Sequence, residues 1–143
     1  MKLVDANVLL YASNGRAEHH EISRGWLSGA LSGSETVIIP WVNVIAYLRL
    51  STHPRLHEKP STVSEALDFV RKVVAVPIVI HGDPDGQHLN RVADLLGATG
   101  RGGNLVNDAH LGALALQYDA TVITFDNDFG RFPGVRWSRP TVD

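Results

Sequence analysis

The sequence predicts an α/β domain, because short β-rich runs alternate with helical segments along the chain. A second observation is that aspartates follow two of these runs: Asp5 comes after Lys2-Leu3-Val4, and Asp126 comes shortly after Ala120-Thr121-Val122-Ile123-Thr124. With 143 residues, the chain is most economically one domain at 1–143 with a single substantial core. We therefore expect acids at the carboxyl ends of buried parallel strands, where open α/β sheets place their ligand crevices.

Between residues 2 and 76 the pattern predicts two strands and three helices. An apolar stripe that includes Ile22 and Trp26 marks the first helix, and Pro40 closes the β-rich run that follows it. The next helix ends before Pro54, because the residue that precedes a proline is pushed out of helical geometry. Ser61 is a good N-cap for the third helix. The expected elements are a strand at 2–5, a helix at 16–32, a strand at 36–39, and helices at 42–51 and 61–76.

The second half of the chain continues the alternation. A turn cluster at 82–86 separates a short strand from a helix, and the stretch 97–103 is the richest in glycine, which favours a mobile loop. Asp108 lies near the start of a helix that is rich in alanine and leucine. The expected elements are a strand at 77–80, a helix from about 85 to 96, a helix from near Asp108 to Tyr118, a strand at 120–124 and a final edge strand within 132–137.

Composition excludes several classes of protein. The chain is 44% hydrophobic and 20% charged, which is typical of an ordinary globular protein. No apolar run approaches the roughly 20 residues that span a bilayer, and the start lacks a basic-then-apolar secretion signal. Because there is no cysteine, disulfides and thiolate metal sites are excluded, and we expect a cytoplasmic protein without a membrane. The formal net charge of −2 argues against a protein that grips nucleic acid over its whole surface, although local arginines can meet phosphates.

Four acids are the candidate catalytic residues: Asp5, Asp108, Asp126 and Asp128. Each also has an ordinary structural interpretation, as a helix cap, a helix N-terminal acid or a turn residue. Taken together they indicate a shared site, because carboxylates gathered at one sheet edge repel one another unless a hard cation neutralises them. The sequence therefore predicts bound Mg²⁺ or Mn²⁺ and chemistry directed at phosphate.

Other classes of site fit less well. A zinc site is less favoured than magnesium, because His19 and His20 diverge on a helix and no cysteine is present. A magnesium phosphohydrolase would carry a second aspartate in the motif after the first strand, but Asp5-Ala6-Asn7 has none. A phospho-acceptor receiver domain would have paired acids there and a lysine after the last strand, and neither is present.

Several segments together resemble the PIN domain, specifically the VapC-type ribonuclease toxins of prokaryotic toxin–antitoxin pairs. The resemblance spans essentially the whole chain. It rests on Leu3-Val4-Asp5-Ala6-Asn7-Val8-Leu9, on residues 47–55, on Asn107-Asp108-Ala109-His110-Leu111, on Thr124-Phe125-Asp126-Asn127-Asp128-Phe129 and on Arg131-Phe132-Pro133-Gly134.

The resemblance implies a three-layer α/β/α sandwich with a central, mostly parallel sheet. It implies a metal-dependent endoribonuclease, with Mg²⁺ or Mn²⁺ held by Asp5, Asp108 and Asp126. Asp128 is then an auxiliary ligand or a group that positions water, and Thr124 is a supporting hydroxyl. The implied partners are the RNA substrate, a cognate antitoxin protein and a second copy of the chain in a homodimer.

One departure from the family pattern bears on activity. PIN domains usually place a further glutamate on the helix after the second strand, and here that position is occupied by Ala46, while the nearby Asn43 offers only an amide. A missing carboxylate weakens a second metal position. The alternative function is therefore a catalytically weak or inactive PIN-fold module that binds RNA or a partner.

Overall fold

The computed structural model describes residues 1–142 and contains one five-stranded sheet. The strands lie in the order β3-β2-β1-β4-β5, and all four neighbouring pairs are parallel. The first strand is therefore central, although it is at the start of the chain. The strands are β1 (Lys2–Val4), β2 (Val37–Ile38), β3 (Val79–Ile80), β4 (Thr121–Ile123) and β5 (Arg136–Ser138).

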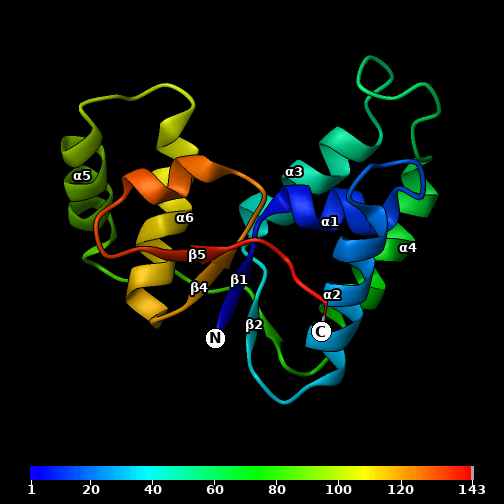
Figure 1. Cartoon of the computed structure of the whole chain (residues 1–143), viewed down its shortest axis with the longest axis horizontal. Helices are drawn as coiled ribbons and strands as arrows, with labels where there is room; N and C mark the ends of the chain where they lie inside the picture. Colours follow the sequence, from blue (N-terminus) through cyan, green and yellow to red (C-terminus); the bar gives the residue numbers. More distant parts are fainter. Residues whose placement is uncertain (143) are drawn as a thin grey trace.

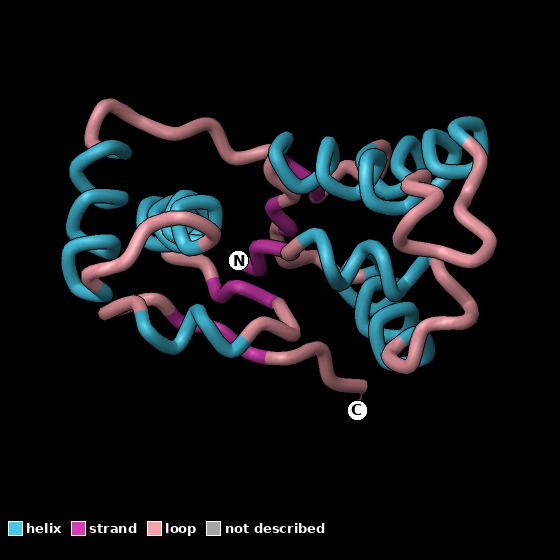
Figure 2. The backbone as a smooth tube through the Cα atoms, turned by 90° about the horizontal axis from the view of Figure 1, so that it is seen from above, coloured by secondary structure: helices cyan, strands magenta, loops and turns pink. Residues whose placement is uncertain are grey.

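Six α-helices cover the two faces of this sheet. Helices α5 and α6 form one layer, and α1 to α4 lie on the other side of the strands (Figure 1; the tube in Figure 2 gives the view from above). The predicted α/β sandwich with a parallel sheet is confirmed. The helices are α1 (Ala6–Ser13), α2 (His20–Ser32), α3 (Trp41–Ser51), α4 (Val63–Val74), α5 (His88–Thr99) and α6 (Leu105–Tyr118), with a 3₁₀ helix η1 (Asn127–Arg131).

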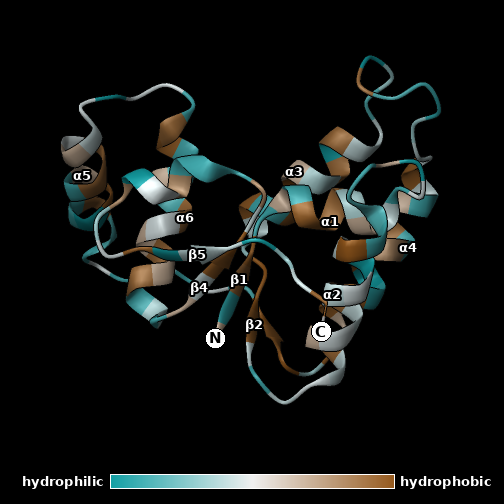
Figure 3. Cartoon of the chain, viewed as in Figure 1, coloured by the Kyte–Doolittle hydropathy of each residue, from teal (hydrophilic) through white to brown (hydrophobic). Residues whose placement is uncertain are grey.

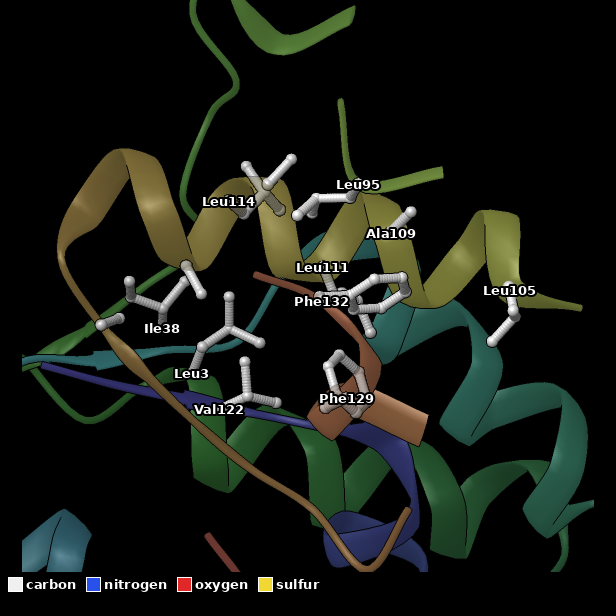
Figure 4. Packing of buried hydrophobic residues seen from close by; sticks show 13 residues of the cluster. Leu3, Ile38, Leu95, Leu105, Ala109, Leu111, Leu114, Val122, Phe129 and Phe132 are labelled. Carbon is white, nitrogen blue, oxygen red and sulfur yellow. The ribbon is translucent and has the colours of Figure 1, made fainter. Parts of the chain in front are cut away.

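The strands bury side chains on both faces, because successive residues of a strand point in opposite directions. In β1, Leu3 belongs to the cluster under α5 and α6, whereas Val4 belongs to the cluster under α1 to α4. In the neighbouring β4, Val122 and Ile123 divide in the same way. Figure 4 shows Leu3 and Val122 beneath the residues of α6. A strand buried on both faces has to be apolar throughout, which explains the short β-branched runs in the sequence.

Helix α6 is the most deeply packed helix of its layer, with seven buried residues. Its Gly112 allows the close approach of α5 and the segment after η1, because a Cβ there would lie 3.1 Å from a methyl of Leu95 and 3.3 Å from one of Val135. In Figure 3, β2 is strongly hydrophobic between the two layers, and the connection from α3 to α4 on the outside is mostly hydrophilic. Tight packing of α6 fixes the position of its first turn, which carries Asp108.

The main difference from the sequence prediction is helix α1, which the pattern analysis missed. Asp5 is its N-cap and Val8, Leu9 and Ala12 are buried on one side of it. This spacing is helical, but eight residues are too few for a clear periodic signal. The first long helix also starts later than predicted, at His20, and the helix expected at 85–96 runs on to Thr99.

The predicted glycine-rich loop is accordingly shorter than expected. Gly97 lies inside α5, and Gly100 ends the helix in the left-handed conformation, with φ of 64°. The predicted edge strand at 132–137 forms later, at Arg136–Ser138, and pairs in parallel with β4. No helix in residues 1–142 combines the length and the apolar character that crossing a bilayer requires.

Candidate metal centre

The site is at the carboxyl edge of the two central strands. Strands β1 and β4 pair in parallel with Val4 opposite Ile123, so the residues that follow them, Asp5 and Thr124, emerge at the same edge. The backbone N–H of Asp5 donates to the carbonyl of Ile123 at 3.0 Å and continues the ladder by one residue. Two segments that are more than a hundred residues apart in sequence are thereby held in register.

Asp5 is buried and held by hydrogen bonds to both carboxylate oxygens. Its Oδ1 accepts from the backbone N–H of Ala6 at 2.8 Å, and its Oδ2 accepts from the hydroxyl of Thr124 at 2.8 Å. Only 9% of the residue is exposed. Burial raises the pKa of Asp5, while the hydrogen bonds from Thr124 and Ala6 oppose the rise. The carboxylate is therefore fixed in position and costly to keep charged without a nearby cation.

Thr124 is the centre of the local hydrogen-bond network. Its hydroxyl donates to Asp5 and accepts from the backbone N–H of Asp126 at 2.9 Å and from the amide of Asn7 at 3.3 Å. One donor and two lone pairs are all that a hydroxyl has, so its capacity is used. The predicted supporting role agrees with this position: Thr124 orients two of the acids rather than presenting a free oxygen to a ligand.

Asp108, Asp126 and Asp128 converge beside this network. One carboxylate oxygen from each lies within 4.8 Å of the others. Asp108 comes from the first turn of α6, and Asp126 is the N-cap of η1, where its Oδ1 accepts from the backbone N–H of Asp128 at 2.9 Å. The cap explains the Asp-x-Asp spacing, because it turns both side chains toward the start of α6.

The electrostatics of this cluster are unfavourable without a cation. Burial, the negative charges of Asp126, Asp5 and Asp128, and a hydrogen bond with Asp126 together raise the pKa of Asp108 to about 7. The donors are all carboxylate oxygens, which are the ligands that hard divalent cations prefer. The chemistry of the donor set and the repulsion between its members both fit a bound Mg²⁺ or Mn²⁺.

The geometry places Asp128 closer to the predicted ligands than its auxiliary role implies. The three oxygens that are close enough to bind one ion belong to Asp108, Asp126 and Asp128. Asp128 therefore lies in the cluster and not at its margin. Asp5, predicted as a central ligand, lies close enough for its charge to act on Asp108, and each of its oxygens accepts one hydrogen bond and keeps a lone pair that a cation could use. The site thus has a convergent triad with a buried fourth acid beside it.

The position of the missing glutamate is on α3. Ala46 is half-buried and brings no polar atom. Asn43 is fully buried, and its Nδ2 donates to the carbonyl of Val4 at 2.8 Å, while its Oδ1 has no hydrogen-bond partner in the described chain. Asn43 therefore ties α3 to the end of β1, next to Asp5, and contributes no charge to the site.

Basic side chains border one side of the triad. A hollow of about 270 Å³ is lined by Arg101 and Arg131 together with Asp128, and Arg131 Nε lies 3.2 Å from Asp128 Oδ1. Arg101 and Arg131 are therefore candidates for the local arginines that can meet phosphates. Arg136, another candidate, pairs with Asp119 at 2.9 Å and lies apart from this hollow.

The histidines do not form a metal site in the described residues. His110 Nδ1 lies 2.7 Å from His88 Nε2, between α5 and α6. His53 accepts from the backbone N–H of Arg55, and His57 Nε2 contacts the carbonyl of Leu50.

Comparison with known proteins gives one consistent result. The PIN domain family matches residues 2–135. Ribonuclease VapC37 of Mycobacterium tuberculosis is 46% identical over 140 residues, which cover 98% of this chain and 97% of that protein. Ribonuclease VapC25 of the same organism is 35% identical over 142 residues, covering 99% and 100%.

Solved structures agree at the level of the fold. A structure of VapBC2 from Rickettsia felis, bound to a DNA fragment from the promoter, covers 96% of this chain and 97% of its own, with a TM-score of 0.65 at 17% identity. A structure of VapC20 from Mycobacterium tuberculosis, described as a toxin that cleaves the sarcin–ricin loop, covers 95% and 99% with a TM-score of 0.66 at 16% identity.

Proposed function

The chain belongs to the PIN-domain family and to its VapC ribonucleases. From this premise we propose that it is the endoribonuclease toxin of a toxin–antitoxin pair. We also propose that it forms a single domain at 1–143. The observation that carries the proposal is the gathering of Asp108, Asp126 and Asp128 at the carboxyl edge of the sheet, with Asp5 beside them. That arrangement suits hydrolysis of a phosphodiester with a divalent cation.

We propose that Asp5, Asp108 and Asp126 hold Mg²⁺ or Mn²⁺ and that Asp128, whose carboxylate lies in the same group, assists them. When bound, such an ion neutralises the carboxylates, acidifies a water and stabilises charge on the phosphate. Thr124 keeps Asp5 and Asp126 in place through its hydroxyl. Asp108 and Asp128 are the two candidates for accepting a proton from the attacking water, and Arg131 supports Asp128 by pairing with its Oδ1.

RNA is the proposed substrate, and single-stranded or looped RNA in particular. Asp128 lines an open hollow and not an enclosed cavity, so exposed phosphates and unpaired bases can approach the acids there. Arg101 and Arg131 line that hollow and would meet the phosphates on either side of the scissile bond.

The proposed protein partner is a cognate antitoxin, as in the VapBC structures that share this fold. An apolar groove of about 560 Å³ runs between α1, α2 and α4, and Leu27, Leu31 and Phe69 line it. Its basic residues Arg24 and Lys72 suit an antitoxin segment with acidic flanks. An antitoxin arginine inserted among the aspartates would also compete with the metal, because guanidinium pairs carboxylates bidentately.

We further propose a homodimer that buries the outer face of α3. Trp41 and Ile45 are 55% and 60% exposed, and Ile45 lines an apolar hollow with Leu48, Val63 and Leu67. Neighbouring apolar groups of this size on a surface are typical of a protein–protein contact. In the structure the helices α2 and α3 each form a separate hollow with α4.

The deciding experiment is cleavage of a structured RNA by the purified protein. Wild type should cleave with Mg²⁺ or Mn²⁺ and stop with EDTA, and Asp126→Asn should not cleave. Asp68→Asn, on the exposed surface of α4, is a matched control and should retain activity. Coexpression with the product of the neighbouring gene should yield a complex and restore growth. Cleavage that is unaffected by Asp126→Asn would assign the chemistry to another site.

The second candidate function is a PIN-fold module that binds RNA or a partner without cutting it. Ala46 favours it, because the side chain there supplies no carboxylate. The same assay separates the two functions: a binding module would bind RNA equally well with and without metal and would release no product. Absence of product, together with binding by both wild type and Asp126→Asn, would support the module.

A further inference from the structure

A second hollow, of about 290 Å³, lies at the outer ends of α1 and α3, away from the acids. It is formed where the α1–α2 connection meets the α3–α4 connection, at the upper right of Figure 1. Its lining is polar and contains no acidic residue. The side chains that matter are Ser13, Arg16, Ser51, His57, Lys59 and Ser61.

The walls of this hollow are held in shape by hydrogen bonds. The backbone N–H of Ser61 donates to the carbonyl of Ser51 at 2.9 Å and closes the segment between them into a loop. Within that loop His57 Nε2 donates to the carbonyl of Leu50 at 2.9 Å. A ligand group that enters the hollow would therefore meet groups that are already positioned, which reduces the ordering cost of binding.

The two basic side chains of this hollow are not paired with acidic residues of the described chain. Arg16 and Lys59 form no ion pair with any residue between 1 and 142. The carbonyls at the helix ends, which would otherwise attract them, have other donors. The carbonyl of Leu10 accepts from Ser13 Oγ and from the N–H of Asn14, and that of Leu50 accepts from His57. A positive hollow with hydroxyl groups in its lining is thus present in a chain whose net charge is −2.

The hollow is connected to the acidic site by a single helix. Asp5 is the N-cap of α1, and Ser13 at its other end lines the hollow. At 1.5 Å per residue, eight helical residues span about 12 Å. RNA phosphates recur every few ångströms along a strand, so a strand cleaved at the acids can place another phosphate here a few nucleotides away.

We propose that this hollow binds a backbone phosphate of the RNA, through Arg16 and Lys59 with the hydroxyl of Ser61, a few nucleotides from the scissile bond. The inference rests on the proposed ribonuclease function for its ligand, but its geometry is independent of the acids. It assigns to the connections α1–α2 and α3–α4 a role in holding substrate.

The test measures RNA binding without cleavage, in full-length Asp126→Asn protein. A fluorescein-labelled 12-nucleotide RNA is titrated at several KCl concentrations against this parent and against the same chain with Lys59→Ala or Arg16→Ala. The control is Arg71→Ala, which removes an exposed positive charge of α4 that lies outside the hollow. Lys59 and Arg16 are exposed, so all variants should fold, and circular dichroism checks this.

Lys59→Ala and Arg16→Ala should each weaken binding about fivefold, and each should reduce the slope of log affinity against log salt by about 0.7, the loss of one single-strand phosphate contact. Arg71→Ala should change neither quantity. A 12-nucleotide RNA with one uncharged methylphosphonate linkage supplies the matching change on the ligand. When the uncharged linkage is the one that occupies the hollow, the loss of binding affinity that it causes and the loss caused by Lys59→Ala should not be additive.

Equal effects of Lys59→Ala and Arg71→Ala would overturn the proposal, since general charge would then account for both. Loss of inorganic phosphate binding in Lys59→Ala, with RNA binding unchanged, would make the hollow a site for a free anion and would equally overturn it. Failure of the ribonuclease proposal gives a different result, namely no metal-dependent cleavage by the wild type, whatever Lys59→Ala does to binding.

Discussion

Replacing Asp108 with asparagine should stabilise the protein in the absence of metal while abolishing metal-dependent cleavage. The substitution keeps the volume of the side chain and removes its charge. In the folded protein, burial and the charges of Asp126, Asp5 and Asp128 raise the pKa of Asp108 from 3.8 to about 7. The folded state therefore holds this proton to higher pH than the unfolded state does. Ionisation of Asp108 removes stability progressively as the pH rises from about 4 to about 7, and the loss is complete above that.

The size of the effect follows from the shift. A rise of about three pKa units corresponds to about 4 kcal/mol at about 1.4 kcal/mol per unit. Asp108 is only half-buried, so solvent screening reduces this figure, and we expect about 2 kcal/mol. For a chain of this size that is a difference of about 4–8 °C in Tm. Because asparagine does not ionise, the variant should gain this advantage over wild type between about pH 4 and pH 8.

The assay is thermal unfolding in EDTA at pH 4.5, 6 and 8, followed by circular dichroism. The Tm of Asp108→Asn should rise relative to that of wild type as the pH rises. The difference in Tm between the surface control Asp68→Asn and wild type should not change with pH. Added Mg²⁺ or Mn²⁺ at pH 8 should raise the Tm of wild type more than that of Asp108→Asn. A pH-independent difference between Asp108→Asn and wild type would refute the electrostatic reasoning, even if cleavage is lost.

Three further outcomes are expected. Asp126→Asn should lose metal-dependent RNA cleavage by at least about 100-fold with an unchanged circular dichroism spectrum, because it removes a ligand charge with almost no change in volume; cleavage at the wild-type rate would contradict this. Thr124→Val should lower the free energy of unfolding in urea by about 1–3 kcal/mol, because Asp5 Oδ2 and the N–H of Asp126 lose a buried partner; an unchanged midpoint would remove Thr124 from its central role. Ile45→Glu should convert a dimer into a monomer in sedimentation experiments, and a dimer that persists would place the interface elsewhere.

The acidic site was open to prediction because strand order and residue type constrain it strongly. Asp5 and Asp126 both follow apolar runs, and parallel strands bring their carboxyl ends to one edge of the sheet. Helix α6 could be placed from its composition, and Asp108 from its position near the start. The pattern did not show how the acids are positioned, because that depends on hydrogen bonds. The hydroxyl of Thr124 donates to Asp5, and Asp126 accepts from the backbone N–H of Asp128, which lies in the same cluster.

Short elements were harder to predict than long ones. Helix α1 has eight residues, and its buried Val8 and Leu9 are adjacent, so the segment reads as a continuation of the preceding strand as readily as a helix. The hydrophobic period needs more than two turns to become distinct. The hollow at the far end of α1 was out of reach for the same reason, because it depends on where that unrecognised helix ends and on the fold of the 52–60 segment.

The departure at Ala46 bears on the number of metal ions. In residues 1–142 one group of three acids, Asp108, Asp126 and Asp128, has carboxylate oxygens within 4.8 Å of one another, and the charge of Asp5 acts on Asp108 from nearby. Three carboxylates carry more negative charge than one divalent cation neutralises, but a second cation would need ligands from the side of α3. That side offers the methyl group of Ala46, and the amide of Asn43 is turned to the carbonyl of Val4. We therefore propose a single ion, because α3 supplies no carboxylate for a second one, with further neutralisation of the phosphate left to arginines such as Arg131.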